Sequence, residues 1–308
     1  MSPVELAQRV ESELVGWRLS RLRDALRGPL AIITAGGLRP VAALWARLHE
    51  ASGHAAWTLT PYDFLERSVP PGTRILILSR RGRHHDVLAA ARHAERIGCA
   101  VHGIVESAKA PLVSMVRNFS PDNEVVILDS VAQSEDPWHL CRCVAMTMLA
   151  TALYPHDGPR AAAYSTRVPS LPTTVPKQVV GLGVGLAYPA ALDFSIRVAE
   201  VGLAASVATD PRNASHALAR PYEPEETWFV FFTLPDHLAY ATRFADHLPE
   251  AVGRTFVTTT RSGAAGAIEL MARSALASPV LGELPSCRSA EEARWVSDLY
   301  FLALDSER

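Results

Sequence analysis

The sequence of 308 residues has few cysteines, little net charge and no long apolar run. Its four cysteines fit a reducing compartment, and Cys141 and Cys143 lack a second ligand pair at zinc spacing, so no metal is expected. A formal net charge of −2 gives no overall attraction to nucleic acid or to an anionic membrane. No stretch approaches the roughly 20 apolar residues of a membrane-spanning helix. Neither nucleic acid nor a membrane is therefore expected as a partner.

The first residues carry acidic side chains at helical spacing and lack the apolar centre of a signal peptide. Together with the cysteine usage, this predicts a cytoplasmic protein. The composition is that of an ordinary globular protein, with 48% hydrophobic and 20% charged residues. The length suits one large domain or two of medium size.

Strands and helices alternate along the first half of the chain. Strands are expected at 29–37, 74–79, 100–105 and 124–129, and helices at 3–26, 40–53, 84–97 and 137–153. Strands that alternate with helices of this length indicate βαβ units, and hence a parallel, doubly wound sheet.

The segment 154–176 is rich in Pro, Ser and Thr and is interpreted as a linker. The same alternation then begins again, with strands expected at 178–185, 204–210, 227–233 and 254–260 and helices at 187–202, 235–249 and 289–304. The predicted organisation is a first domain at 1–153, which includes the helix 3–26 as a lead-in, the linker 154–176, and a second domain at 177–308.

A basic turn follows the expected strand 74–79. It holds Arg80, Arg81, Arg83, His84 and His85 around one glycine, Gly82. Turns after the carboxyl ends of parallel strands are the usual ligand sites of open α/β sheets, and guanidinium groups bind phosphate bidentately. The turn is therefore a candidate anion site for a ligand such as a bisphosphate or a nucleotide sugar. Alternatively, its arginines pair with Asp86, Glu95 or Glu106, or lie in solvent.

The stretch GLGVG at 181–185 is similar to a dinucleotide-binding turn but lacks two of its features. Leu186 occupies the position of the third glycine, and no acidic residue appears at a strand end about 20 residues further on, because Asp210 comes too late. No nicotinamide, flavin or other cofactor is expected.

Residues 178–217 resemble the second domain of the tandem SIS (sugar isomerase) family, in particular the isomerase half of glucosamine-6-phosphate synthase. The resemblance is carried by the strand and glycine turn at 178–185, by Tyr188-Pro189, by Ala191-Leu192-Asp193, and by the spacing of sixteen residues from Glu200 to His216. Residues 34–53 and 78–98 are similar to two strand-turn-helix pieces of the family's first domain. The resemblance covers roughly 29–150 and 177–260. It implies two flavodoxin-like, three-layer α/β/α domains with parallel sheets.

The resemblance also implies a function and a set of site residues. Glu200 would move a proton between C1 and C2 of an open-chain sugar, and His216 would help to open the sugar ring. The ligand would be a sugar phosphate or a nucleotide sugar, and the assembly a homodimer. The substrate-binding residues implied by the two turns and the second-half helix are Gly36, Gly37, Arg39, Ser79, Arg80, Arg81, Gly82, His84 and Asp193.

The chain departs from the family pattern in its phosphate-binding turn, where Arg81 and His84 occupy positions of hydroxyl residues. The family's C-terminal tail, with its substrate-binding lysine, has no counterpart before the chain stops at 302–308. Two hypotheses follow. The protein is an aldose–ketose isomerase or a related enzyme, or it is a sensor or scaffold that binds a phosphosugar without catalysis.

Overall fold

The computed structural model describes residues 19–128, 176–200, 202–217 and 223–283. The expected helices 137–153 and 289–304, the linker 154–176 except its last residue, and most of the expected helix 3–26 lie outside these ranges.

A five-stranded parallel sheet forms the first half, in the order β2-β1-β3-β4-β5. Its strands are β1 (Leu30–Ile33), β2 (Ala56–Leu59), β3 (Arg74–Leu78), β4 (Val101–Val105) and β5 (Val125–Ile127). The prediction of four strands here is confirmed, and the fifth, β2, was not predicted. This strand order is that of a flavodoxin-like doubly wound sheet.

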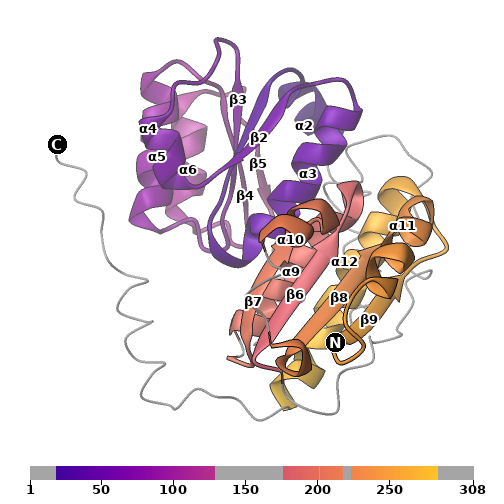
Figure 1. The fold of residues 1–308 in the computed structure, drawn as a ribbon. Helices are drawn as coiled ribbons and strands as arrows, with labels where there is room; N and C mark the ends of the chain where they lie inside the picture. The colour runs from indigo at the N-terminus through magenta and orange to yellow at the C-terminus, as the bar shows by residue number, and fades with distance from the viewer. Residues whose placement is uncertain (1–18, 129–175, 201, 218–222, 284–308) are drawn as a thin grey trace.

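Helices cover both faces of the first sheet, with α4, α5 and α6 on one side and α2 and α3 on the other (Figure 1). The helical elements are α2 (Leu19–Ala25), the 3₁₀ turn η1 (Gly36–Leu38), α3 (Arg39–Ala51), α4 (Pro61–Glu66), α5 (His85–Arg96) and α6 (Pro111–Phe119). Successive strand residues point to opposite faces, so Ile32 packs with α3 whereas Ile33 packs with α5 and α6. The result is three layers around β1 and β3.

The second half has a four-stranded parallel sheet in the order β7-β6-β8-β9. Its elements are β6 (Gln178–Gly183), η3 (Gly185–Ala187), α9 (Tyr188–Glu200), β7 (Ala205–Thr209), α10 (Pro211–Ala217), η4 (Pro224–Glu226), β8 (Thr227–Thr233), α11 (Pro235–Asp246), β9 (Gly253–Thr258) and α12 (Gly263–Glu283). α9 and α12 pack on one face of this sheet, and α10 and α11 on the other. All four predicted strands are present, whereas α10 and α12 were not predicted.

The second half repeats the beginning of the first. In each half a central strand leads into a three-residue 3₁₀ turn and then a helix of 13 residues, α3 or α9. Gly36 and Gly185 open the two turns with φ of 60° and 57°, a left-handed conformation that favours glycine. Pro40 and Pro189 occupy the second position of the two helices, where a proline costs no helical hydrogen bond. The two sheets are therefore similar units.

One hydrophobic core runs through both halves. It includes Trp45 of α3, Phe194 of α9 and Trp228 of β8, each at most 2% exposed. α3 packs against α9, and the Arg47 guanidinium lies 5.7 Å from the centre of the Tyr188 ring. This contact positions the start of α9 beside the first half.

Candidate functional site

The carboxyl ends of β1 and β3 are neighbours at the centre of the first sheet. The chain leaves β1 towards α3 on one face and leaves β3 towards α5 on the other, which makes this place the switch point where open α/β sheets bind ligands. The Thr34 hydroxyl, just after β1, donates a hydrogen bond to the carbonyl of Leu78 over 3.0 Å. The turns 34–39 and 79–84 therefore begin side by side.

Ser79 and Gly82 form the interior of the basic turn. The Gly82 N–H donates to the Ser79 hydroxyl oxygen over 3.1 Å, and the Gly82 carbonyl accepts from the Leu112 N–H over 3.0 Å. Gly82 has φ of 52°, and a Cβ there would lie 3.0 Å from the Leu112 Cβ. Arg81 and Arg83 on either side are exposed. The turn thus holds Gly82 inside and presents two guanidinium groups to solvent.

Arg80 has an ion-pair partner in the adjacent turn. Its Nε lies 3.3 Å from Oε2 of Glu106, a buried residue that directly follows β4, and the Glu106 N–H donates to the Arg80 carbonyl over 3.1 Å. The alternative of pairing with Glu106 therefore holds for Arg80. His84 is the N-cap residue of α5, and Arg39 is exposed at the start of α3. The exposed cations of this edge include Arg39 as well as the two exposed arginines of the basic turn.

Glu200 is the last residue of α9 and reaches the glycine turn of the first half. Its Oε1 lies 3.6 Å from the position that a Cβ would occupy at Gly37. A Cβ there would be in ordinary van der Waals contact with the carboxylate, so the carboxylate lies directly beside the turn. Packing of α9 against η1 and α3 fixes this approach. The structure brings the predicted base beside Gly37, although the two residues come from different halves.

The surroundings of Glu200 make its carboxylate more basic than usual. One side of the residue is open to solvent, but burial of the carboxylate raises its pKa. Arg197, one turn earlier, lowers the pKa of Glu200, and Asp193, two turns earlier, raises it. A carboxylate with a raised pKa is the kind of group that abstracts a proton from carbon near neutral pH.

Asp193 lies inside the protein rather than at the glycine turn. Its Oδ2 accepts a hydrogen bond from Arg197 Nε over 2.7 Å and another from the Ser274 hydroxyl of α12 over 2.7 Å. The spacing of Asp193 and Arg197 in an apolar helix is a sequence signal for this pair. Ser274 gave no such signal, because α12 itself was not predicted.

His216 lies in the last turn of α10, and its side chain is exposed. α10 follows β7, which neighbours β6, so it lies at the carboxyl edge of the second sheet. No hydrogen bond or ion pair of the described residues joins His216 to Glu200. The spacing of sixteen residues therefore places His216 on α10, the next helix after α9, but does not bring its side chain into contact with Glu200.

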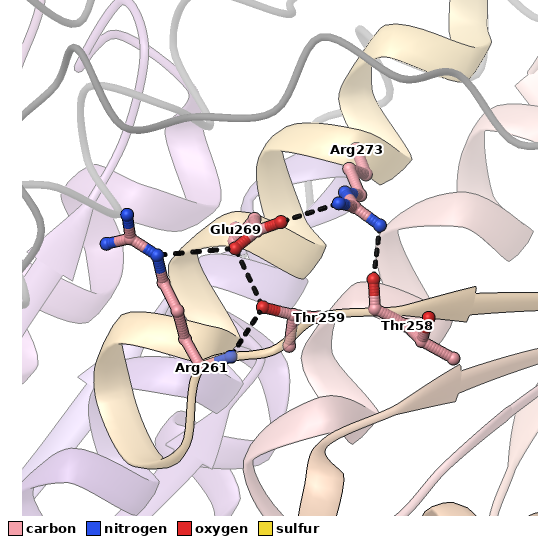
Figure 2. Close-up of polar contacts among 5 residues, drawn as sticks. All are labelled: Thr258, Thr259, Arg261, Glu269 and Arg273. Carbon is pink, nitrogen blue, oxygen red and sulfur yellow. Dashed lines mark hydrogen bonds and ion pairs between the residues drawn. The ribbon is translucent and has the colours of Figure 1, made fainter.

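A second polar cluster lies at the carboxyl end of β9, where Figure 2 shows Arg261 and Arg273 on either side of Glu269. Glu269 Oε1 lies 2.6 Å from Arg273 Nη2, and its Oε2 accepts from the Thr259 hydroxyl over 2.7 Å. Arg273 also donates to the Thr258 carbonyl, and the Arg261 N–H donates to the Thr259 hydroxyl oxygen over 3.1 Å. These bonds fix the turn from β9 into α12. The sequence analysis did not identify this cluster.

The described residues contain no group of three His, Cys, Asp or Glu side chains arranged to hold a metal ion. Of the helices in the described ranges, none has the length and apolar character needed to cross a bilayer.

Several solved structures share this fold. Tagatose-6-phosphate ketose/aldose isomerase from Escherichia coli superposes with a TM-score of 0.70 at 15% identity, covering 92% of each chain. Glucosamine-6-phosphate deaminase from Thermotoga maritima gives 0.65 at 12% identity, covering 91% of this chain and 92% of that one. The C-terminal domain of glucosamine-fructose-6-phosphate aminotransferase from Francisella tularensis superposes with a TM-score of 0.64 at 11% identity. The match covers 91% of this chain and 93% of that one. No protein-family model matches the sequence, and no curated protein matches it by sequence. The likeness is one of fold.

Proposed function

We propose that the protein binds a sugar phosphate between the turns 34–39 and 79–84 and that Glu200 catalyses aldose–ketose isomerisation. The main support is the approach of Glu200 Oε1 to within 3.6 Å of a Cβ position at Gly37, which unites the proposed base with the proposed binding turn. Neighbours of the same fold include an isomerase and a deaminase of sugar phosphates. The exposed Arg39, Arg81 and Arg83 supply charge for the phosphate.

In the proposed reaction the Glu200 carboxylate removes the proton from C2 of an open-chain aldose. The electron pair of that C–H bond forms the C1–C2 double bond, and the carbonyl oxygen at C1 takes up a proton to give an enediol. Glu200 then returns a proton to C1 while the C2 hydroxyl loses its proton and becomes the new carbonyl. The raised pKa of Glu200 suits a group that both takes and returns a proton.

Deuterium exchange tests the catalytic step. Fructose 6-phosphate, tagatose 6-phosphate and glucosamine 6-phosphate are each incubated with the protein in D₂O, and incorporation next to the carbonyl is followed by NMR. Glu200→Gln keeps the size of the side chain and removes its basicity, so we expect exchange to fall by about 10²–10⁴-fold. Glu50→Gln, at the exposed end of the equivalent helix α3, is the matched control and should leave exchange unchanged.

Calorimetry with the same sugar phosphates tests the binding turn. Arg81→Ala should weaken binding by about 1.5–3 kcal/mol, because it removes a charged hydrogen-bond donor from the phosphate. Arg92→Ala, at an exposed position further along α5, is the control. Equal binding by parent and Arg81→Ala would remove the basic turn from the site.

A phosphosugar sensor without catalysis is the second candidate. It is favoured by the pairing of Arg80 with Glu106 and by the use of the Ser79 hydroxyl inside the turn, since both leave fewer groups for a substrate. Binding of a sugar phosphate with no incorporation of deuterium by the parent protein would support the sensor against the enzyme.

A further inference from the structure

Glu106 is a buried carboxylate beside the basic turn of the first half. It directly follows β4, the strand that neighbours β3, and its side chain is 7% exposed. Removing a carboxylate from water is costly unless a cation or several hydrogen-bond donors compensate for it. Its place at the carboxyl edge of the sheet, where open α/β sheets bind ligands, suggests a role in binding.

Glu106 holds Arg80 by both the backbone and the side chain. The Glu106 N–H donates to the Arg80 carbonyl over 3.1 Å, and Arg80 Nε donates to Glu106 Oε2 over 3.3 Å. Just before them, the Ser79 N–H donates to the Ile104 carbonyl over 3.1 Å. Glu106 takes part in a further interaction besides these, so it keeps a partner when Arg80 is substituted. The start of the basic turn is thus fixed against the end of β4.

The bond through Nε leaves the other end of the Arg80 guanidinium accessible. The described residues provide no hydrogen bond to its Nη1 or Nη2, and the side chain is 38% exposed. These two nitrogens form an edge with which arginine can bind phosphate bidentately. Arg81 and Arg83 are exposed, and no described residue bonds to either guanidinium, so both lose more side-chain freedom when they bind a ligand. Arg80 is therefore the arginine of this turn whose position is fixed in advance, which lowers the entropic cost of binding.

We propose that Glu106 is a positioning residue for phosphate binding. It holds Arg80 at Nε so that Nη1 and Nη2 bind the phosphate of the ligand, and Glu106 itself does not touch the ligand. The pairing that occupies one nitrogen of Arg80 thereby orients the other two. This role rests on the proposed binding of a sugar phosphate at the basic turn, and it does not depend on catalysis by Glu200.

Two variants of Glu106 test the proposal. Glu106→Gln and Glu106→Ala both remove the negative charge, but only the first keeps an oxygen that accepts a hydrogen bond from Arg80 Nε. Calorimetry with fructose 6-phosphate and ³¹P NMR with inorganic phosphate measure the dissociation constants. Glu106→Ala should bind both compounds about 3–10-fold more weakly than Glu106→Gln, because the ligand must then immobilise Arg80 itself. Glu95→Ala and Glu95→Gln, at an exposed position of α5, are the matched controls and should bind alike.

The same two substitutions in an Arg80→Ala background separate positioning from a structural role. Without the guanidinium, the difference between the two variants of Glu106 should disappear. A difference that persists there would mean that Glu106 shapes the turn through other contacts, and it would overturn the proposal. Tighter binding by Glu106→Ala than by Glu106→Gln would also overturn it, because Glu106 would then withhold Arg80 from the ligand.

Arg80→Lys provides a test that does not require the Arg80→Ala variants to fold. Lysine keeps the positive charge and can pair with Glu106, but it lacks a second edge for the phosphate. Binding of fructose 6-phosphate should therefore weaken by about tenfold. Arg92→Lys, at an exposed position of α5, should bind as the parent does. Unchanged binding by Arg80→Lys would contradict the proposal.

The deuterium exchange assay distinguishes failure of this proposal from failure of the proposed function. If the variants of Glu106 differ as expected while the parent exchanges no deuterium, Glu106 is a positioning residue and the assignment as an isomerase fails. If the parent exchanges deuterium while the variants of Glu106 bind alike, the isomerase stands and the role of Glu106 fails. A parent that binds neither phosphate compound would overturn both.

Discussion

His102 is a single residue whose charge is governed by its surroundings. It lies in β4 and is 2% exposed, and its Nδ1 accepts the N–H of Glu124 over 3.0 Å. The proton of the neutral ring is therefore on Nε2. Burial, assisted by the charge of Arg74, lowers the pKa of His102 from 6.5 to about 4. Between pH 4 and pH 6.5, His102 therefore binds a proton more readily in the unfolded chain than in the native protein.

We predict that His102 makes the protein less stable at mildly acidic pH. The contribution of neutral His102 to the free energy of unfolding is complete above about pH 6.5. It is lost as the pH falls towards 4, and the free energy of unfolding then decreases by about 3 kcal/mol. His102→Gln keeps an acceptor for the Glu124 N–H but cannot titrate. Urea unfolding at pH 7 and pH 4 should therefore show the parent losing about 3 kcal/mol relative to this variant. The exposed His85→Gln serves as control, and parallel losses in parent and His102→Gln would contradict the prediction.

Residue types at the first switch point could be predicted from the sequence, because Gly82 and its basic neighbours directly follow a buried strand. Their partners could not be fixed in the same way. Glu106 directly follows another strand, and it was only one of several possible partners predicted for the arginines. Asp193 was expected near the substrate, but its neighbours depend on how α12 packs against α9.

At the scale of elements, helices and strands with a strong local hydrophobic pattern were predicted, and those without one were not. β8 has the predicted bounds 227–233, because its apolar side chains run without interruption and both faces of the strand are buried. α12 was not predicted. Ala267, Ile268, Leu270 and Met271 are buried, and Glu269 between them is buried as well. The buried residues therefore run without interruption, and no exposed face marks a helical period there.

Gly82 links three elements, and its substitution tests that link. Gly82→Ala forces a φ of 52° on alanine and brings its Cβ within 3.1 Å of Ala110 Cβ and Val105 Cγ1. Gly98→Ala, after α5, meets the same conformational cost at φ of 74° with nothing within 4 Å. We predict that Gly82→Ala lowers the free energy of unfolding by about 1–3 kcal/mol more than Gly98→Ala. Urea unfolding measures both, and equal losses would mean that the turn relaxes freely.

At the scale of the whole molecule, the restart of the strand-turn-helix pattern predicted two similar α/β halves. The four strands of the second sheet repeat the order of the first four strands of the five-stranded sheet. The continuous core was not predicted, because a helix pattern shows that α3 and α9 have buried faces but not that these faces meet. Division into separate domains at 154–176 stays a prediction. The Glu200 approach to Gly37 depends on this packing and could be expected only from the family resemblance.

The surface of the second half bears on assembly. Leu238 and Tyr240 of α11 and Phe256 of β9 are exposed apolar side chains on two elements that pack together. The Phe256 ring stacks on Phe231 at 4.7 Å, and β9 is an edge strand of the described sheet. Exposed apolar groups beside an open strand edge are typical of surfaces that associate. They support the homodimer that the family resemblance implies.

We therefore predict a particle of about 67 kDa, twice the chain mass of 33.4 kDa, in sedimentation at micromolar concentration. Phe256→Glu places a charge on the edge strand and should shift the particle towards the mass of one chain. Tyr62→Glu, which changes an exposed aromatic residue on α4 of the other half, is the control and should remain dimeric. A parent protein that sediments as one chain would refute the dimer, and a dimeric Phe256→Glu variant would place the interface away from β9.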